Sequence, residues 1–353
     1  MKKAEVRIVW LYLLNMLCII LLLSACGKEK GGETGHILPQ QRPDYTEEEY
    51  EEIDYEWEPL FDSYEDNYLV HEWTEEQTGI GRPYGICVVG DSVYICDFDN
   101  HCVVKLDKKG NRVASYGELG AESGNFTNPT AITCHDGQIY VLDQGNHRIQ
   151  IFDMDMNYQQ EVPYLSVTFD KNDYFQDMAI DKEGVIYLSV WTNASTYGVY
   201  YISKDGRAIA MEPRISGALA EYRGEVYAMN TFMNYKLDGS YSMGWGANFF
   251  LKCTSGGLEQ LAELPYKYTP ADFCIVDDVI YAISLHGYER QLNRLTMGGE
   301  LDSAVYIFAT KERDWSNIVN EPATFPFYLD VIDDGHIYAV DSLWKTVYYF
   351  EKK

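Results

Sequence analysis

Four polar side chains occupy the same place relative to a repeated tyrosine, and their oxygen atoms are suited to a hard cation. Each follows that tyrosine by three residues: Asp97, Asp143, Asn230 and Asp341. Carboxylate and amide oxygens are the ligands that Ca²⁺ prefers. The same residue types also cap turns by bonding nearby backbone N–H groups, which is the alternative role. We expect no cofactor, and Ca²⁺ is the metal that these residues would hold.

Histidines recur at comparable places. His101, His147 and His286 each follow an expected middle strand, so they would lie on one face of the protein. Imidazole is a common zinc ligand. However, the first two belong to a repeated turn, and no nucleophile elbow, Cys-His pairing or phosphate-binding glycine loop is evident. The sequence therefore leans away from an enzyme, with a hydrolase or lyase using a divalent metal near the centre of the fold as the alternative.

Aromatic side chains replace the polar turn that follows the middle strand in the later repeats. The residues are Trp191, Phe232, Tyr288 and Trp344. Flat apolar rings with a polar edge suit the face of a sugar ring or an extended peptide. Packing as core between neighbouring repeats is the alternative. We expect these four residues to bind a protein, peptide or glycan.

The elements that position these residues form six copies of one pattern. Each copy has a middle strand with an apolar-tyrosine pair, and the tyrosines are Tyr94, Tyr140, Tyr187, Tyr227, Tyr281 and Tyr338. Spacings of roughly 40 to 57 residues suit units of four short strands, as in the blades of a β-propeller. A tyrosine repeated in every unit indicates packing between units.

The clearest copy is Pro129 to Phe152, which contains the segments Asp-Gly-Gln-Ile-Tyr-Val-Leu-Asp and Asn-His-Arg-Ile-Gln-Ile-Phe. This copy closely resembles an NHL repeat, and the resemblance is specific over residues 82–152. It implies an all-β, six-bladed β-propeller. NHL-like and six-bladed propellers include a zinc lyase and calcium lactonases, so the resemblance also makes zinc or calcium near the axis the metal sites to test.

The last copy, which ends at Phe350, lacks an outer strand. Residues 66–73 resemble residues 110–117, which are expected to form the outer strand of the first blade. We therefore predict that residues 67–73 complete the last blade and close the ring, which removes an open sheet edge. The propeller would span residues 67–353.

The N-terminal segment predicts export and lipid attachment. Residues 1–25 combine basic residues with a 16-residue, nearly all-apolar run at 8–23, which is too short to span a bilayer and typical of a signal peptide. The sequence Leu-Ser-Ala-Cys resembles a bacterial lipobox and makes Cys26 the lipid acceptor; a shortened membrane anchor is the alternative. Acyl chains on Cys26 would hold the protein on the extracytoplasmic side of the bacterial cell membrane. Residues 26–66 form a strongly acidic segment, expected to be an extended, disordered tether.

Charge excludes one class of partner. The formal net charge of −27 disfavours nucleic acid, which requires lysine and arginine to neutralise phosphates. The partners expected are the membrane, through the acyl chains, and an unknown protein, peptide or glycan. The function predicted is a membrane-anchored recognition module, with a structural subunit of an envelope assembly as a further alternative.

Six cysteines remain after the lipobox: Cys87, Cys96, Cys102, Cys134, Cys253 and Cys274. Their spacing has no metal-ligand rhythm. We expect most of them to be buried free thiols, and the sequence leaves their pairing open.

Overall fold

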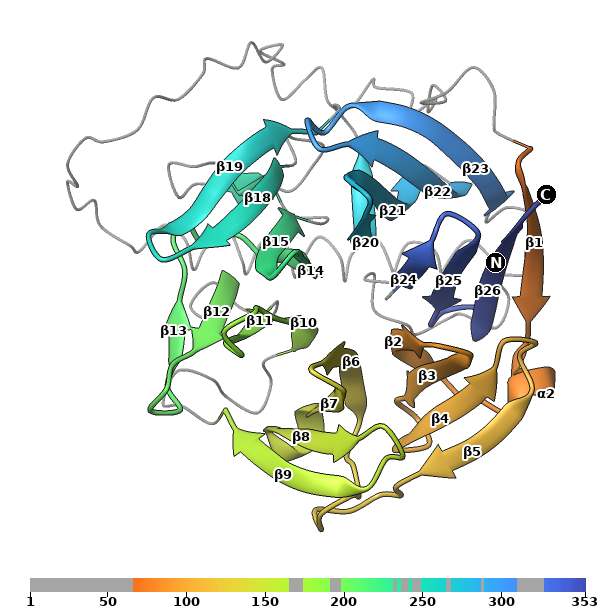
Figure 1. The fold of residues 1–353 in the computed structure, drawn as a ribbon, viewed down its shortest axis with the longest axis vertical. Helices are drawn as coiled ribbons and strands as arrows, with labels where there is room; N and C mark the ends of the chain where they lie inside the picture. Colours follow the sequence, from red (N-terminus) through yellow and green to blue (C-terminus); the bar gives the residue numbers. More distant parts are fainter. Residues whose placement is uncertain are drawn as a thin grey trace, which may run out of the picture. The chain divides into compact units, whose positions relative to one another are not determined.

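The computed structural model describes residues 66–164, 174–190, 198–230, 234–235, 241–242, 249–264, 268–286, 289–309 and 327–353. All of them belong to one compact unit, residues 57–353. Six four-stranded antiparallel sheets form the framework of the described part. The all-β, six-bladed propeller predicted from the repeats is therefore confirmed (Figure 1).

The first three blades are built from consecutive strands. Blade 1 contains β2 (Pro83–Val89), β3 (Ser92–Asp97), β4 (Cys102–Asp107) and β5 (Arg112–Tyr116). Blade 2 contains β6 (Pro129–His135), β7 (Gln138–Asp143), β8 (Arg148–Asp153) and β9 (Tyr158–Pro163). Blade 3 contains β10 (Phe175–Ile180), β11 (Ile186–Val190), β12 (Gly198–Ile202) and β13 (Ala208–Ala210).

The other three blades follow the same plan, except that a short hairpin intervenes in the chain between the second and third strands of blade 4 and that blade 6 takes one strand from the N-terminal side. Blade 4 contains β14 (Gly217–Tyr222), β15 (Glu225–Asn230), β18 (Phe249–Thr254) and β19 (Gly257–Glu263). Blade 5 contains β20 (Thr269–Val276), β21 (Val279–His286), β22 (Glu289–Thr296) and β23 (Leu301–Ala309). Blade 6 contains β24 (Phe327–Asp333), β25 (His336–Asp341) and β26 (Thr346–Lys352), and its fourth strand is β1 (Tyr68–Trp73). Smaller elements are α2 (Glu75–Thr78), η1 (Gln144–Asn146) and the hairpin of β16 (Asn234–Tyr235) and β17 (Tyr241–Ser242).

The first strand of each blade lies innermost, and these strands contact one another in a closed circuit. The order is β2, β6, β10, β14, β20, β24 and again β2, as Figure 1 shows around the centre of the ring. Blades 3 and 6 are consequently on opposite sides of the axis.

Strand β1 closes the ring. It pairs antiparallel with β26 from Tyr68 opposite Lys352 to Trp73 opposite Val347. The backbone N–H of Lys353 adds a bond of 2.8 Å to the carbonyl of Asn67. Trp73 is buried, and its ring centroid lies 6.1 Å from that of Tyr338. The N-terminal strand thus occupies the place that its resemblance to residues 110–117 predicts.

The core is divided among the interfaces between successive blades. Alternating side chains of the innermost and middle strands fill these interfaces, as the two-residue period of a strand requires. Tyr94, for example, packs into the cluster between blades 1 and 2, and Tyr281 packs between blades 5 and 6. The remaining repeated tyrosines pack in the same way against the following blade. The prediction that this tyrosine serves packing between blades is confirmed.

No helix among the described residues is long and apolar enough to cross a membrane. The predicted signal peptide, residues 1–25, and the predicted tether, residues 26–66, lie outside the described residues except for Asp66.

Candidate functional site

Asp97, the first candidate calcium ligand, is buried at the end of β3. It caps both the turn that follows β3 and the segment that leads into β2. Its carboxylate accepts bonds from the backbone N–H groups of Gly81 and Arg82 at 3.0 and 3.2 Å. It also accepts one from Asn100 Nδ2 at 2.7 Å. These bonds hold the first strand of blade 1 to the end of the second.

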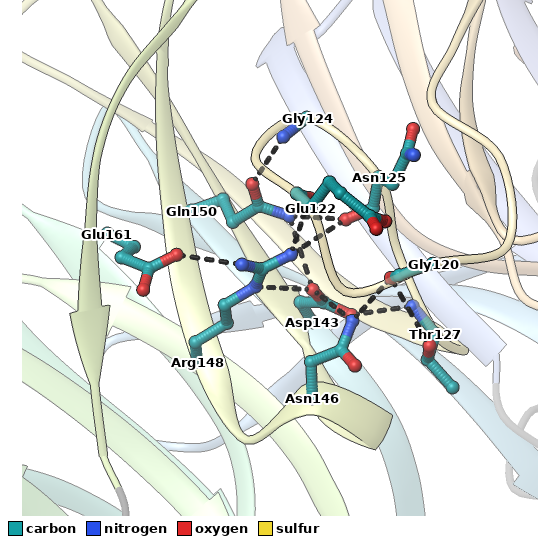
Figure 2. A network of polar contacts seen from close by, with 10 residues as sticks. All are labelled: Gly120, Glu122, Gly124, Asn125, Thr127, Asp143, Asn146, Arg148, Gln150 and Glu161. Atoms are coloured by element: carbon teal, nitrogen blue, oxygen red, sulfur yellow. Dashed lines mark hydrogen bonds and ion pairs between the residues drawn. The ribbon is translucent and has the colours of Figure 1, made fainter.

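Asp143 is the centre of the polar network in Figure 2. Its oxygens accept bonds from the Thr127 N–H at 2.7 Å, Asn146 Nδ2 at 2.9 Å and Arg148 Nε at 2.9 Å. Burial raises the pKa of Asp143, and these donors oppose that increase. The side chain of Arg148 extends the network to Glu161 at 2.8 Å.

The same network fixes the loop that links blades 1 and 2. Arg148 Nη2 donates to the carbonyls of Glu122 and Asn125 at 2.9 and 3.0 Å, and Gln150 Oε1 accepts the Gly124 N–H at 2.8 Å. Figure 2 shows the loop folded over these side chains. Arg148 is therefore a structural cation that organises a loop.

Asp341 occupies the corresponding place in blade 6. It accepts bonds from the N–H groups of Leu343 and Trp344 at 2.9 and 3.1 Å, and from Arg290 Nε at 3.5 Å. Burial raises its pKa, and the positive charge of Arg290 opposes the increase. The side chain of Asn230, the fourth candidate, lies outside the described part. Among the described residues, no group of three or more His, Cys, Asp and Glu side chains is arranged to hold a metal ion.

The candidate zinc ligands also have local roles where the structure describes them. His101 and His147 both adopt positive φ, at 55° and 54°, and each ends the turn after a middle strand. His101 Nδ1 accepts the Asn128 N–H at 3.1 Å. The side chain of His286 lies outside the described part.

Of the four aromatic residues expected to bind a ligand, Trp191, Phe232 and Tyr288 lie outside the described residues. Trp344 is half-buried and packs against the core cluster between blades 5 and 6. Its role in ligand binding stays a prediction.

A different set of aromatic side chains meets at the axis, and we call it the axial aromatic cluster: Tyr84, Phe98, Tyr174 and Tyr328. Tyr84 stacks on Phe98 with centroids 4.8 Å apart, and lies 6.4 Å from Tyr174 and 5.9 Å from Tyr328. The hydroxyls of Tyr174 and Tyr328 are 3.3 Å apart. The cluster draws on blades 1 and 6 and on the segment that enters blade 3, so it reaches across the axis.

The cluster has both a sealed and an accessible part. Tyr84 and Tyr328 are buried, whereas Phe98 and Tyr174 are half-buried. The guanidinium carbon of Arg82 lies 5.7 Å from the centroid of the Phe98 ring, within the range of a cation–π contact. Aromatic faces, hydroxyl groups and one cation are therefore combined at this end of the ring.

Three aspartates on innermost strands join one blade to the next. Asp177 of β10 accepts the Leu219 N–H of β14 at 2.7 Å, and Asp272 of β20 accepts the Leu329 N–H of β24, also at 2.7 Å. Asp330 of β24 accepts the Val88 N–H of β2 at 2.5 Å, which links blades 6 and 1.

Burial raises the pKa of all three carboxyls. The pKa of Asp330 is raised to about 6 and that of Asp177 to about 7, while the pKa of Asp272 is also raised by the nearby charge of Asp177. Hydrogen bonds from backbone N–H groups oppose the increase in all three. Our sequence reasoning missed these residues. The signal was an aspartate inside an apolar innermost strand, as in Phe-Gln-Asp-Met-Ala-Ile and Phe-Tyr-Leu-Asp-Val-Ile-Asp.

The six expected thiols are all free in the structure. Cys87, Cys96, Cys102 and Cys253 are buried, and Cys134 and Cys274 are half-buried. The expectation that most are buried free thiols is confirmed.

The ring of six blades and its repeated turns define the class: the protein is a six-bladed β-propeller. The model of the NHL repeat family matches residues 81–106 and 126–152, so blades 1 and 2 of the propeller carry NHL repeats. Blades 3 to 6 keep the architecture while lacking a match to that repeat.

Solved structures with this fold include proteins of different activities. A gluconolactonase from Xanthomonas campestris is 13% identical, with a TM-score of 0.52, covering 80% of this chain and 90% of its own. An aldose sugar dehydrogenase from Streptomyces coelicolor is 11% identical, with a TM-score of 0.52, covering 81% and 99%. Virginiamycin B lyase from Staphylococcus aureus is 12% identical, with a TM-score of 0.50, covering 81% and 100%. At these identities the likeness concerns the fold alone.

Proposed function

We propose that this propeller is a recognition module, held on the extracytoplasmic side of a bacterial membrane by acyl chains on Cys26, that binds a protein, peptide or glycan. The observation that carries the proposal is the axial aromatic cluster with Arg82 beside it. Half-buried Phe98 and Tyr174 offer ring surface to a ligand, and buried Tyr84 and Tyr328 hold them in place. Rigid aromatic groups of this kind bind at a low cost in conformational entropy.

The polar groups that support recognition are the hydroxyl of Tyr174 and the guanidinium of Arg82, whose Nε also pairs with Asp99 at 3.3 Å. A hydroxyl orients a sugar or peptide over an aromatic face, and a guanidinium pairs with a carboxylate. The predicted residues Trp191, Phe232, Tyr288 and Trp344 would extend this surface from the turns that follow the middle strands.

The capping roles of the aspartates support recognition over metal-assisted chemistry. The carboxylates of Asp97, Asp143 and Asp341 accept bonds from backbone or side-chain N–H groups that hold turns together. Donors of this kind compete with a cation for the same oxygens.

A propeller hydrolase or lyase is the second candidate. The observation that favours it is the raised pKa of Asp177 and Asp330 on innermost strands, since carboxyls of raised pKa serve as general acids or bases. A structural subunit of an envelope assembly is the third possibility, and crosslinking before purification would reveal stable partners of that kind.

The test is a screen of the detergent-solubilised full chain against glycan and peptide arrays, followed by variants. Phe98→Ala and Tyr174→Ala are expected to lower ligand capture at least tenfold, because each removes one accessible ring. Val113→Ala is the matched control, since Val113 is 59% exposed on the outermost strand β5.

Trp344→Ala and Trp191→Ala report on the predicted turn surface in the same assay. Undiminished capture by both Phe98→Ala and Tyr174→Ala, with melting temperatures unchanged, would place the binding surface elsewhere. If the native protein turns over a captured lactone or glycoside and Asp177→Asn does not, the result would favour the hydrolase or lyase.

A further inference from the structure

Two cysteines lie in the interface between blades 1 and 2. Cys87 is on the innermost strand β2, and Cys134 is on the innermost strand β6. Cys87 is a buried member of the core cluster between these blades, and Cys134 packs against the same cluster. Both side chains therefore point into one interface from its two sides.

The close approach of β2 and β6 explains why the two thiols meet. A Cβ on Gly85 would lie only 2.7 Å from Ala131 Cα, so glycine allows the two backbones to come together. Cys87 and Cys134 follow this contact by two and three residues on strands that run in the same direction. The two thiols are close enough for each to shift the pKa of the other. Cys134 Sγ also lies 3.8 Å from the Sδ atom of Met154.

The pseudo-symmetry of the ring supplies an internal comparison. Cys87 is paired with Tyr94 across its hairpin, and Cys274 of β20 is paired with the equivalent Tyr281. In the following blade, Cys134 is opposite Ile139, and the equivalent residue opposite Ile337 is Val331. Blade 6 therefore places Val331 at the position that faces Cys274, whereas blade 2 places a second cysteine at the position that faces Cys87. The Sγ atom of Cys274 lies 3.4 Å from the carbonyl of Leu329.

We propose that Cys87 and Cys134 form an oxidation site, at which a disulfide joins blade 1 covalently to blade 2. The oxidant is a disulfide, of a small thiol compound or of a carrier protein. The sulfur of Cys134 attacks one sulfur of that disulfide and releases the first thiol, which takes the proton of Cys134. The sulfur of Cys87 then attacks Cys134 in the mixed disulfide and expels the second thiol, which takes the proton of Cys87. Two protein thiols are oxidised and one disulfide is reduced.

The environment assigns these two roles. Cys134 is half-buried, and the neighbouring thiol of Cys87 lowers the pKa of Cys134. The neighbouring Cys134 and burial raise the pKa of Cys87. Because the thiolate is the attacking species, Cys134 reacts first with the external disulfide, and Cys87 resolves the mixed disulfide.

The test treats the detergent-solubilised full chain with oxidised glutathione at neutral pH, quenches it with acid, alkylates the remaining thiols in denaturant and maps the peptides by mass spectrometry. The expected result is a linked pair of peptides containing Cys87 and Cys134, with the mass of two hydrogen atoms lost. Cys253 and Cys274 stay alkylated. A higher melting temperature of the oxidised protein, reversed by a reductant, is also expected.

Three variants make the result decisive. Cys134→Val keeps an apolar side chain in the interface and is expected to abolish both the link and the change in melting temperature, whereas Cys274→Ser retains both. Val331→Cys places a thiol beside Cys274 and is expected to create a second link. The Val331→Cys variant also shows whether the oxidising conditions are sufficient. If they link Cys274 to the thiol introduced at position 331 while Cys87 and Cys134 are both still alkylated, the proposal is overturned. A link between Cys87 and any other cysteine would also overturn it.

Discussion

The hydroxyl of Tyr328 donates a hydrogen bond of 3.1 Å to the backbone carbonyl of Gln176, and this bond joins blade 6 to blade 3 across the axis. Neighbouring blades contact each other along their innermost strands, but these two blades are on opposite sides of the ring. A tyrosine is long enough to span the gap. Side chains of blades 1 and 6 thus meet the chain of blade 3 across the axis, and the accessible groups of the candidate site belong to this contact.

Closure of the ring by β1 predicts that Trp73→Ala is severely destabilising. Trp73 is 5% exposed and packs against Tyr338 and Tyr349, so its removal should cost about 3 to 5 kcal/mol of unfolding free energy. Leu69, on the same strand and 50% exposed, is the control, and Leu69→Ala should cost less than about 1 kcal/mol. Urea denaturation measures both. Equal losses in the two variants would contradict the role of Trp73 in closing the ring.

The network around Arg148 predicts a large loss of stability in Arg148→Met. The change leaves the carboxylate of Asp143 buried without its guanidinium and frees the loop carbonyls of Glu122 and Asn125, at a cost of about 3 to 5 kcal/mol. The exposed pair Arg207–Asp205 is the control, because Arg207→Met should cost less than about 1 kcal/mol. Chemical denaturation tests this, and similar effects of the two substitutions would show that the network is energetically unimportant.

The raised pKa of Asp330 predicts a pH-dependent effect of Asp330→Asn. The folded pKa of about 6 exceeds the ordinary value of 3.8, so folding favours the protonated acid. Its contribution to stability is fully present below pH 3.8 and is lost as the pH rises through about 6. The unfolding free energy of the native protein minus that of the variant should therefore fall by about 1 to 2 kcal/mol between pH 4.5 and 8, allowing for partial exposure. A difference that does not change with pH would show that this carboxyl has an ordinary pKa.

Lipid attachment predicts that Cys26→Ser releases the protein from acyl-dependent membrane binding. Metabolic labelling with a fatty acid and membrane fractionation measure the outcome. Cys18→Ser changes a cysteine inside the predicted signal peptide and should leave labelling intact. Continued labelling of Cys26→Ser would remove the lipoprotein interpretation.

Periodicity predicted the architecture because every blade repeats one arrangement of strands and turns. The tyrosines at 94, 140 and 338 identify the middle strands, and the resemblance of residues 66–73 to an outer strand located the closing strand of the ring. These features are local in sequence or recur along the chain in the same order, so a single chain reveals them.

The candidate site depends on contacts that no period encodes. Tyr84, Tyr174 and Tyr328 come from different blades, and only the closed ring brings them together. Similarly, Asp97 and Asp143 have the spacing of convergent ligands, but the structure directs them to neighbouring N–H groups. Side chains that converge at an axis have to be located in three dimensions.

The pairing of β1 with β26 also determines how the ring would respond to mechanical load. A pull on the chain preceding Asn67 reaches the propeller first through β1, the strand whose loss leaves blade 6 with three strands. After the ion pair of Asp66 with Lys353, the bond between the N–H of Lys353 and the carbonyl of Asn67 is the first backbone bond to bear that tension. Force from the direction of the N-terminus would therefore open the ring at this seam before it disturbs an interior blade.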